Sequence, residues 1–313
     1  MDGSAAASAG ASGRSSLRTH GRTFHLAHLL LGGRAAADVH LLYGFCRFVD
    51  DECDERPMDE ARVALARIRA DLEAGASDEP SLAGYLQFCE RHTVDPRVTE
   101  AFLRGVEQDL DLHAYSTEAE LLRYCYRVAG TVGLLMCSLF DVEEPRARAF
   151  AVDLGIGMQL TNISRDVLED ACRGRVYVPH ETSDGPLDAA ALAAGDPESV
   201  ARARRAVERL LSLATTYYRS ADEGIAFLPR RAQLAVLTAS RCYEAIGPRI
   251  VAHPGEGLPQ RAHVGAAGKL FHLARAFAAT ARIEASRPFR APAHHGAHLH
   301  LALAGLPGCD VPA

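Results

Sequence analysis

The 313-residue chain contains no tryptophan, and only 6% of its residues are aromatic. It also shows no alternation of apolar and polar residues long enough to seed a sheet, and no repeat of about 20–50 residues. Alanine, leucine and arginine are abundant instead, a composition that favours helices over a β-sandwich or barrel. The hydrophobic content of 48% is enough for a large core. We therefore expect an all-α protein.

The sequence has no long apolar segment either. No window reaches about 18 uninterrupted apolar residues, so we expect no membrane span. Residues 1–16 are rich in Ala, Ser and Gly and lack the apolar core of a signal peptide. None of the eight cysteines forms a C-x-x-C pair, which is typical of reduced thiols in a cytosolic protein. These absences predict a cytoplasmic protein without a stable membrane anchor.

Positive charge is in deficit and is carried almost entirely by arginine. The chain has 34 Lys+Arg against 40 Asp+Glu, a net charge of −6, and Lys269 is its one lysine. A nucleic-acid binder would normally present a basic surface, so we expect no nucleic-acid partner. The planar guanidinium of arginine suits diphosphates well, which makes the positions of particular arginines informative.

Helical patterns dominate the chain between two unpatterned ends. We expect a disordered tail over 1–16, one helical domain over 17–286 and a flexible tail over 287–313. Residues 182–199 predict a surface loop with one short helix, and residues 202–209 predict a solvated helix face. The predicted helices are Leu17–Leu31, Ala35–Val49, Asp59–Glu73, Ser81–Arg91, Pro96–Leu110, Glu118–Phe140, Arg146–Asp170, Ser199–Glu223, Arg230–Ile250 and Val264–Ala285.

Two acidic clusters each continue an apolar helix. Asp50 and Asp54 share one helix face because they are four residues apart, and Asp166 and Asp170 do the same in the second cluster. Like charges at this spacing destabilise a bare helix, so something must offset them. Mg²⁺ prefers carboxylates, waters and substrate phosphates. We therefore favour a metal site for these four aspartates, and a solvated face for the neighbouring Asp51, Glu52 and Glu55.

Polar and basic residues accompany both aspartate pairs. Asn162 lies one turn before Asp166, and Gln159 extends the same stripe. Arg47 lies one turn before Asp51, and Arg165 adjoins Asp166. Carboxylates mixed with arginines suit a Mg²⁺–diphosphate complex, whose charge the two residue types share.

These motifs resemble the squalene/phytoene synthase family, over about residues 20–285. The segment YGFCRFVDDECD from Tyr43 to Asp54 is similar to the first aspartate-rich motif of that family. The segment QLTNISRDVLED from Gln159 to Asp170, followed by GRVYVP, is similar to the second. The remaining matches are the glycine-containing segment from Tyr124 to Gly133, the element Arg22-Thr23-Phe24, Tyr243 and the segment from Arg261 to Lys269.

The resemblance implies a single all-α class I isoprenoid synthase bundle with a central cavity. The two aspartate motifs would face each other across its mouth and bind two or three Mg²⁺ ions with a prenyl diphosphate substrate. The implied metal ligands are Asp50, Asp54, Asn162, Asp166 and Asp170. The implied catalytic residues are the four aspartates with Tyr43 and Tyr124. The implied substrate-binding residues are Arg47, Arg165, Gln159, Phe24, Thr23, Tyr243 and Gly130.

The family's reaction begins with ionisation of an allylic prenyl diphosphate, and two acceptors remain open. The first is a second prenyl diphosphate: head-to-head condensation of two geranylgeranyl or farnesyl diphosphates would give phytoene or a squalene-type product. The second is an aromatic small molecule that receives a short dimethylallyl group in secondary metabolism. Polar residues near the expected cavity, such as His25, His28 and Ser164, motivate that alternative. A non-catalytic assembly factor is remote, because both aspartate motifs are complete.

Two further features have more than one interpretation. The glycines at 130, 133, 155 and 157 predict either close helix contact or a tunnel for prenyl tails. The histidines at 294, 295, 298 and 300 could bind a transition metal, but their Ala/Pro/Gly-rich surroundings offer no rigid frame. For these histidines we favour a solvated tail. Lipid substrates are also compatible with peripheral membrane contact, although no clear amphipathic anchor is present.

Overall fold

The computed structural model describes residues 30–111, 114–252, 258, 264–286 and 294–310. These residues form helices and connecting loops without a strand, which confirms the all-α prediction. Thr23 and Phe24 lie outside the described residues. The chain divides into two compact units, with the boundary after Val94. The units are described separately, and one continuous domain over 17–286 stays a prediction.

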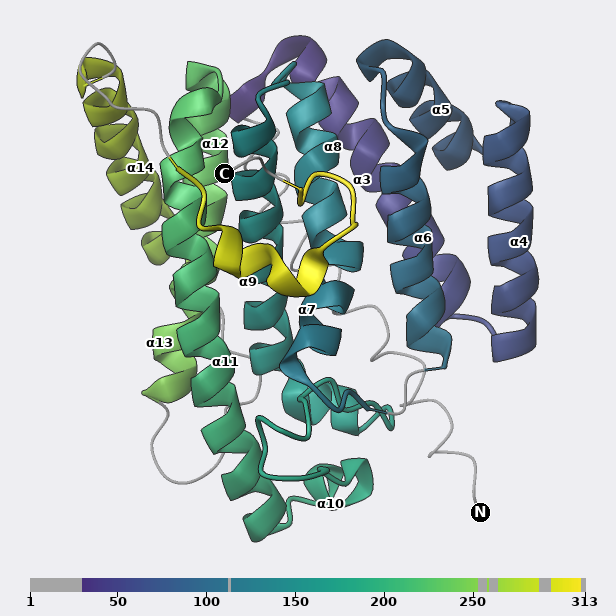
Figure 1. Ribbon diagram of the computed structural model, residues 1–313, viewed down its shortest axis with the longest axis vertical. Coiled ribbons are helices and arrows are strands. Elements are labelled where there is room, and N and C mark those ends of the chain that lie inside the picture. The colour runs from purple at the N-terminus through teal and green to yellow at the C-terminus, as the bar shows by residue number, and fades with distance from the viewer. Residues whose placement is uncertain (1–29, 112–113, 253–257, 259–263, 287–293, 311–313) are drawn as a thin grey trace. The chain divides into compact units, whose positions relative to one another are not determined.

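The described part of the first unit, residues 30–94, contains three helices (Figure 1). Helix α3 packs against both of the others, and Phe45 of α3 stacks on Tyr85 of α5 with ring centroids 3.7 Å apart. The buried carboxylate of Asp38 ties α3 to α5, because it accepts hydrogen bonds from Arg91 and, at 3.1 Å, interacts with His92. The helices are α3 (Gly33–Asp54), α4 (Met58–Ala74) and α5 (Pro80–His92).

The second unit is built around the long helix α9 (Figure 1). Helix α11 packs along α9 over its most extensive contact, and η1, α8 and α12 also contact it. The helices here are α6 (Pro96–Leu110), α7 (Glu118–Cys125), η1 (Tyr126–Gly130), α8 (Thr131–Leu139), α9 (Pro145–Ala171), α10 (Ala189–Ala193), α11 (Pro197–Gly224), η2 (Ile225–Phe227), α12 (Arg230–Glu244), α13 (Ile246–Val251), α14 (Ala266–Ser286) and η4 (Ala297–Leu303).

Local sequence signals explain where several helices begin. Helices α5, α6, α9 and α11 all have proline in their first turn, where the missing N–H is not needed. Asp95 and Asp196 cap α6 and α11 by accepting hydrogen bonds from backbone N–H groups. Thr117 and Glu120 form a capping box at the start of α7. The predicted starts of these helices therefore lie within two residues of the observed ones, and those of α6 and α7 coincide with them.

The predicted helix Glu118–Phe140 is confirmed as helical from Glu118 to Leu139, but its hydrogen-bonding pattern is not uniform. Its central turn, η1, is a π-helix that separates α7 from α8. Helices α6 and α9 both pack so closely against this turn that neither has room for a side chain at the point of contact. A Cβ placed on Gly105 of α6 would lie 2.7 Å from the Cβ of Arg127, and one on Gly155 of α9 would lie 2.3 Å from the carbonyl oxygen of Ala129. Gly133 meets α9 in the same way, so close helix contact is the observed role of Gly133 and Gly155.

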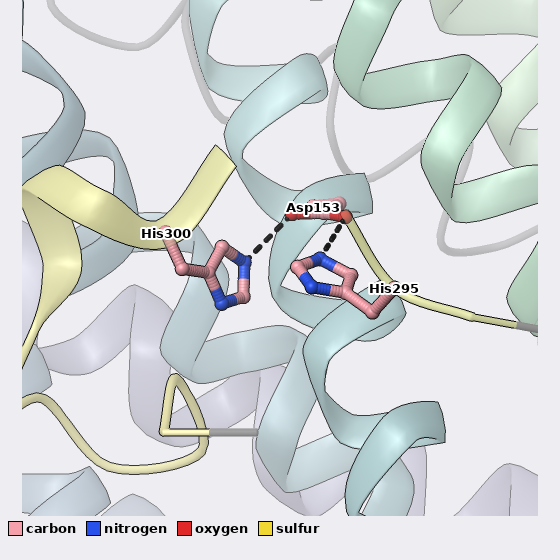
Figure 2. A group of neighbouring side chains, drawn as sticks. All are labelled: Asp153, His295 and His300. Atoms are coloured by element: carbon pink, nitrogen blue, oxygen red, sulfur yellow. Dashed lines mark hydrogen bonds and ion pairs between the residues drawn. The ribbon is translucent and has the colours of Figure 1, made fainter. Parts of the chain in front are cut away.

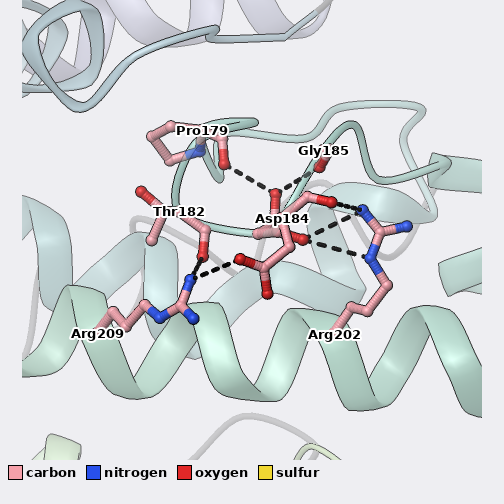
Figure 3. A network of polar contacts seen from close by, with 7 residues as sticks. Pro179, Thr182, Asp184, Gly185, Arg202 and Arg209 are labelled. Carbon is pink, nitrogen blue, oxygen red and sulfur yellow. Dashed lines mark hydrogen bonds and ion pairs between the residues drawn. The ribbon is translucent and has the colours of Figure 1, made fainter.

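The loop that follows α9 is held by arginines of α11 (Figure 3). Arg202 donates hydrogen bonds to the carbonyl oxygens of Ser183, Asp184 and Pro186 at 3.1–3.3 Å. Arg209 donates to the carbonyl oxygen of Thr182 at 2.6 Å and to the Asp184 carboxylate at 3.2 Å. The prediction of a purely solvated face over 202–209 is therefore wrong, because loop carbonyls far away in the sequence supply partners for these guanidinium groups.

Residues 294–310 also differ from the expected solvated tail. They form the 3₁₀ helix η4, which packs against α7, and Leu303 is fully buried. His295 and His300 are buried against α9, and only His294 and His298 are exposed. The expectation fails because α9 buries a carboxylate, Asp153, that pairs with both imidazoles.

The described residues agree with two of the predicted absences. All eight cysteines lie in described segments, and no disulfide joins any of them. Within the described ranges, every helix is too short or too polar to cross a bilayer.

Replacing Gly155 by Ala tests the close approach of α9 to η1. We expect a loss of about 3 kcal/mol in the free energy of unfolding, because the new methyl group would collide with a backbone carbonyl that cannot move aside cheaply. Gly44→Ala is the matched control: a Cβ there meets nothing within 4 Å. Because Gly44 lies in the interior of α3, Gly44→Ala should stabilise the protein by about 0.5–1 kcal/mol. Urea unfolding measures both, and a Gly155→Ala variant as stable as the parent would contradict the packing.

Candidate active site

The first aspartate motif lies in the last two turns of α3. The helix continues through Asp54, so Asp50 and Asp54 are on one face as predicted; Asp50 is partly buried and Asp54 is exposed. Arg47 donates to the carboxylate of Asp51 at 3.1 Å. A hydrogen bond with Tyr43 and the charge of Asp51 raise the pKa of Arg47. The structure thus joins Tyr43, Arg47 and Asp51 and holds the guanidinium beside the acidic turn.

The second motif occupies the C-terminal half of α9. Asn162 and Asp166 are buried, and Asp170 at the next turn is partly exposed. The Asn162 side-chain amide donates to the side-chain oxygen Oε1 of Gln159 at 3.1 Å. The predicted polar stripe from Gln159 to Asp170 therefore exists on one helix.

Arg165 is paired with the neighbouring Asp166. Its Nε and Nη2 atoms both donate to that carboxylate, the former at 2.7 Å, and its side chain is only 1% exposed. Burial disfavours the guanidinium charge, but the pairing with Asp166 outweighs it and raises the pKa of Arg165. Its buried Nη1 atom has no hydrogen-bond partner. Asp166 thus orients Arg165, and the Nη1 atom makes no hydrogen bond to a described residue.

Asp170 lies close to a second negative charge. Burial, followed by the charge of Asp166, raises the pKa of Asp170 to about 8. Arg173 and Arg175 oppose this shift without cancelling it. Two carboxylates that repel each other at a half-buried helix face are a donor set for a divalent cation, which would neutralise both. The residues present therefore fit Mg²⁺.

A cluster of tyrosines next to the second motif centres on Asp109 of α6. The hydroxyl groups of Tyr124 and Tyr177 donate to its two carboxylate oxygens at 2.9 and 3.2 Å. The rings of Tyr124 and Tyr177 stack with centroids 5.4 Å apart, and Tyr115 packs against both. Burial and the Asp109 charge raise the pKa of Tyr124, so its phenol stays protonated.

The cluster is electrostatically linked to the aspartate motif. The charge of Asp170 is among the influences that raise the pKa of Tyr177, after burial and Asp109. Asp109, Tyr115 and Tyr177 were not predicted as site residues. Asp109 ends a helix in the run Glu-Gln-Asp-Leu-Asp, which reads as a solvated helix end. In the structure, Asp109 is the carboxylate that accepts the hydrogen bonds of Tyr124 and Tyr177.

Two further predicted substrate-binding residues are buried in the second unit. The phenol of Tyr243 on α12 is close enough to Arg165 to raise its pKa. Gly130 ends η1, where a Cβ would lie 3.1 Å from the Tyr126 ring and 3.3 Å from Val152. Their contact with substrate stays a prediction. So does the facing arrangement of the two motifs, which belong to different compact units.

Two solved structures with the same fold are named as a dehydrosqualene synthase and a squalene synthase. A dehydrosqualene synthase superimposes with a TM-score of 0.69 and 26% identity, covering 86% of this chain and 95% of its own. The squalene synthase of Alicyclobacillus acidocaldarius superimposes with a TM-score of 0.63 at 21% identity, covering 76% and 91%. The fold and the two aspartate motifs thus define an all-α synthase of the isoprenoid class.

Sequence comparison narrows the class to one family. The phytoene synthase of Rhodobacter capsulatus is 36% identical over 86% of this chain and 81% of its own length. The phytoene synthase of Pseudescherichia vulneris is 33% identical over 87% of this chain and 92% of its own. The squalene/phytoene synthase family model matches residues 17–268. The chain belongs to the squalene/phytoene synthase family and is a prenyltransferase.

Arg165→Met tests the buried pair. We expect a loss of about 3 kcal/mol in unfolding free energy, because Asp166 would keep its charge without its partner. Adding Asp166→Asn should recover part of the loss, so the two changes will be non-additive. Arg173→Met breaks the more exposed pair with Glu169 (3.0 Å) and should cost about 0.5 kcal/mol or less. Equal effects of Arg165→Met and Arg173→Met in urea unfolding would rule out a special role for the Arg165 pair.

Proposed function

We propose that the chain is a Mg²⁺-dependent synthase that condenses two geranylgeranyl diphosphates head-to-head into phytoene, with release of two diphosphates. The similarity to phytoene synthases along most of the chain supports this proposal most strongly. The complete pair of aspartate motifs supports the metal dependence. A farnesyl substrate with a squalene-type product is the nearest variant of the same chemistry.

In this proposal, the metal-binding oxygens come from both motifs. Asp50 and Asp54 of α3, with Asn162, Asp166 and Asp170 of α9, would hold two or three Mg²⁺ ions. When bound, Mg²⁺ neutralises charge that develops on the leaving diphosphate. The raised pKa of Asp170 supports its part, because a cation offsets the repulsion from Asp166.

The two predicted arginines differ in their surroundings, so we infer different tasks. Arg47 is about one-third exposed and is steadied by Tyr43 and Asp51, which leaves it able to contact a diphosphate. Arg165 is buried, and two of its three guanidinium nitrogens, Nε and Nη2, donate to Asp166. We infer that it mainly orients Asp166, with the unpartnered Nη1 as its remaining donor.

The tyrosines contribute rings rather than proton transfer. The hydroxyl of Tyr124 is bonded to Asp109, and its pKa lies well above the usual value, so it does not serve as a base at neutral pH. Its aromatic face can stabilise an allylic cation by a cation–π interaction. Exclusion of water is essential in this chemistry, since water would capture the cation. We propose the same use of the aromatic face for Tyr43 and Tyr243.

Peripheral membrane contact stays a prediction, and α14 is the described element that best supports it. Leu270, Phe271 and Phe277 are 59–68% exposed on this helix, and Arg275 lies 5.8 Å from the centroid of the Phe271 ring. Apolar residues flanked by arginine suit an anionic lipid surface. Phe271→Ser combined with Phe277→Ser should lower co-sedimentation with anionic vesicles. Leu301→Ser, at a 76% exposed position elsewhere, should not.

Metal dependence can be tested in solution and by substitution. We expect turnover to cease in excess EDTA and to return with Mg²⁺. Asp50→Asn and Asp166→Asn should each lower kcat by about 100-fold or more, since each removes a charged metal ligand. Glu52→Gln is the control in the same acidic run, because Glu52 pairs with Arg56 at 2.6 Å, and it should stay within about twofold. Full turnover in EDTA would refute the metal dependence.

The identity of the acceptor can be tested by offering the enzyme different substrates. Geranylgeranyl diphosphate alone should yield a C40 hydrocarbon detected by mass spectrometry. Formation of a C30 product from farnesyl diphosphate alone would show that the proposed chain length is wrong. Consumption of dimethylallyl diphosphate with an aromatic acceptor, and no product from the C15 or C20 diphosphates, would decide for the aromatic alternative. Absence of turnover with every diphosphate would favour the assembly factor.

A further inference from the structure

A second group of metal-ligating side chains lies away from both aspartate motifs. Asp153 is on the N-terminal half of α9, three turns before Asp166, and is fully buried. His295 and His300 come from the C-terminal segment, and their side chains are 1% and 4% exposed. Figure 2 shows both imidazole rings pointing toward the Asp153 carboxylate. One ligand atom from each residue lies within 4.8 Å of the other two.

The contacts use both carboxylate oxygens. The Nε2 atom of His295 lies 2.8 Å from Oδ2 of Asp153, and Nε2 of His300 lies 2.8 Å from Oδ1. Ser220 of α11 donates to Oδ2 at 2.5 Å. The imidazoles themselves are close, with ring centroids 4.3 Å apart. Two nitrogens and a carboxylate therefore converge on one small volume.

The charge of this cluster is not balanced by an arginine or lysine. Burial disfavours ionisation, but the hydrogen bonds from the two histidines outweigh it and hold the pKa of Asp153 below its usual range. The carboxylate is thus ionised, and its described ion pairs are with His295 and His300 alone. With both imidazoles neutral, a net negative charge stays buried, which is costly unless a cation is present.

We propose that Asp153, His295 and His300 bind one structural Zn²⁺ ion that fastens the C-terminal segment to α9. Imidazole nitrogen and carboxylate oxygen are ligands that Zn²⁺ prefers, whereas Mg²⁺ favours all-oxygen sites. The ion takes the position of the two Nε2 protons, and each neutral imidazole then carries its proton on Nδ1. Tetrahedral Zn²⁺ keeps neighbouring ligand atoms about 3.3 Å apart. The present 2.8 Å N···O contacts would open by about 0.5 Å, and the ligand atoms of the three residues already lie within 4.8 Å of one another.

The surroundings of His300 match those of a zinc ligand. Its other ring nitrogen, Nδ1, faces the carbonyl oxygen of Cys309 at 3.4 Å. A histidine that binds a metal commonly donates its second N–H to a backbone carbonyl, which sets the ring orientation. Among the described residues, Nδ1 of His295 has no hydrogen-bond partner, and this ring is held by its Nε2 contact and by the rings of His300 and Phe150.

The segment held by the ion makes three further contacts with the second unit. Tyr126 of η1 donates to the carbonyl oxygen of Pro307 at 2.7 Å, and Tyr217 of α11 donates to that of Leu299 at 2.9 Å. Arg123 of α7 donates to that of Ala302 at 2.8 Å. Zinc binding therefore stabilises the docking of the segment beside the π-helical turn. None of these residues is assigned to prenyl transfer, so the inference is independent of the proposed reaction.

The experiment uses the full-length, untagged chain in excess Mg²⁺, which occupies the all-oxygen motifs. After incubation with Zn²⁺ and removal of unbound metal, we expect one retained Zn²⁺ per chain. Replacing Zn²⁺ by Co²⁺ should give the intense visible absorption of four-coordinate, nitrogen-ligated cobalt. Zn²⁺ should raise the thermal unfolding midpoint by on the order of 5–10 °C at saturating concentration.

Substitutions locate the ion. His300→Gln and His295→Gln should abolish Zn²⁺ retention, the cobalt absorption and the thermal shift. His298→Gln, an exposed histidine of the same segment, should preserve all three. Asp166→Asn should also preserve them while abolishing turnover, which separates this site from the active site.

A parent chain that retains no Zn²⁺ and lacks the cobalt absorption overturns the proposal. This measurement on the parent chain decides the question even if a histidine variant fails to fold. Equal zinc retention by His298→Gln and His300→Gln would likewise overturn it.

Discussion

The cost of burying charge on α9 governs much of this structure. A carboxylate removed from water needs a positively charged or hydrogen-bonding partner. Without one, its pKa rises and the charged form destabilises the fold. Three aspartates of this helix meet that need in different ways. Asp166 pairs with Arg165. Asp153 forms hydrogen bonds with His295, His300 and Ser220. The pKa of Asp170 is raised. The partners of these aspartates determine what each end of α9 can bind.

Helix packing places these groups with little tolerance. Gly133 and Gly155 let η1 and α8 approach α9 until a side chain would strike a backbone carbonyl. The π-helical turn between α7 and α8 sits within this contact, and π-helical turns often occur at functional sites. Tyr124, in the last turn of α7, donates a hydrogen bond to Asp109, and Tyr126 of η1 donates one to Pro307 of the C-terminal segment. The same close packing thus connects the candidate active site with the proposed zinc site.

The aspartate motifs combine preformed and adaptable parts. Arg165 and Asp166 are rigidly paired inside the second unit, whereas Asp50 and Asp54 stand on the exposed end of α3. A buried, oriented carboxylate can present one oxygen to a metal without reorganisation, and exposed carboxylates can adjust to a diphosphate of variable position. This division suits an enzyme whose charged substrate enters from water and whose prenyl chains must be kept dry.

The sequence alone determined the helical class, most helix limits and the composition of both aspartate stripes. It could do so because i, i+4 spacing, capping residues and proline in the first turn act over a few residues. Only the tertiary structure decided which charges find partners. Asp109 and Asp111 look alike in sequence, yet the hydroxyl groups of Tyr124 and Tyr177 both donate to Asp109, and Tyr177 is 68 residues away. His295 and His300 lie in a segment of tail-like composition, and their burial depends on Asp153, more than 140 residues away. Such pairings arise from the packing of whole helices, and no local pattern contains them.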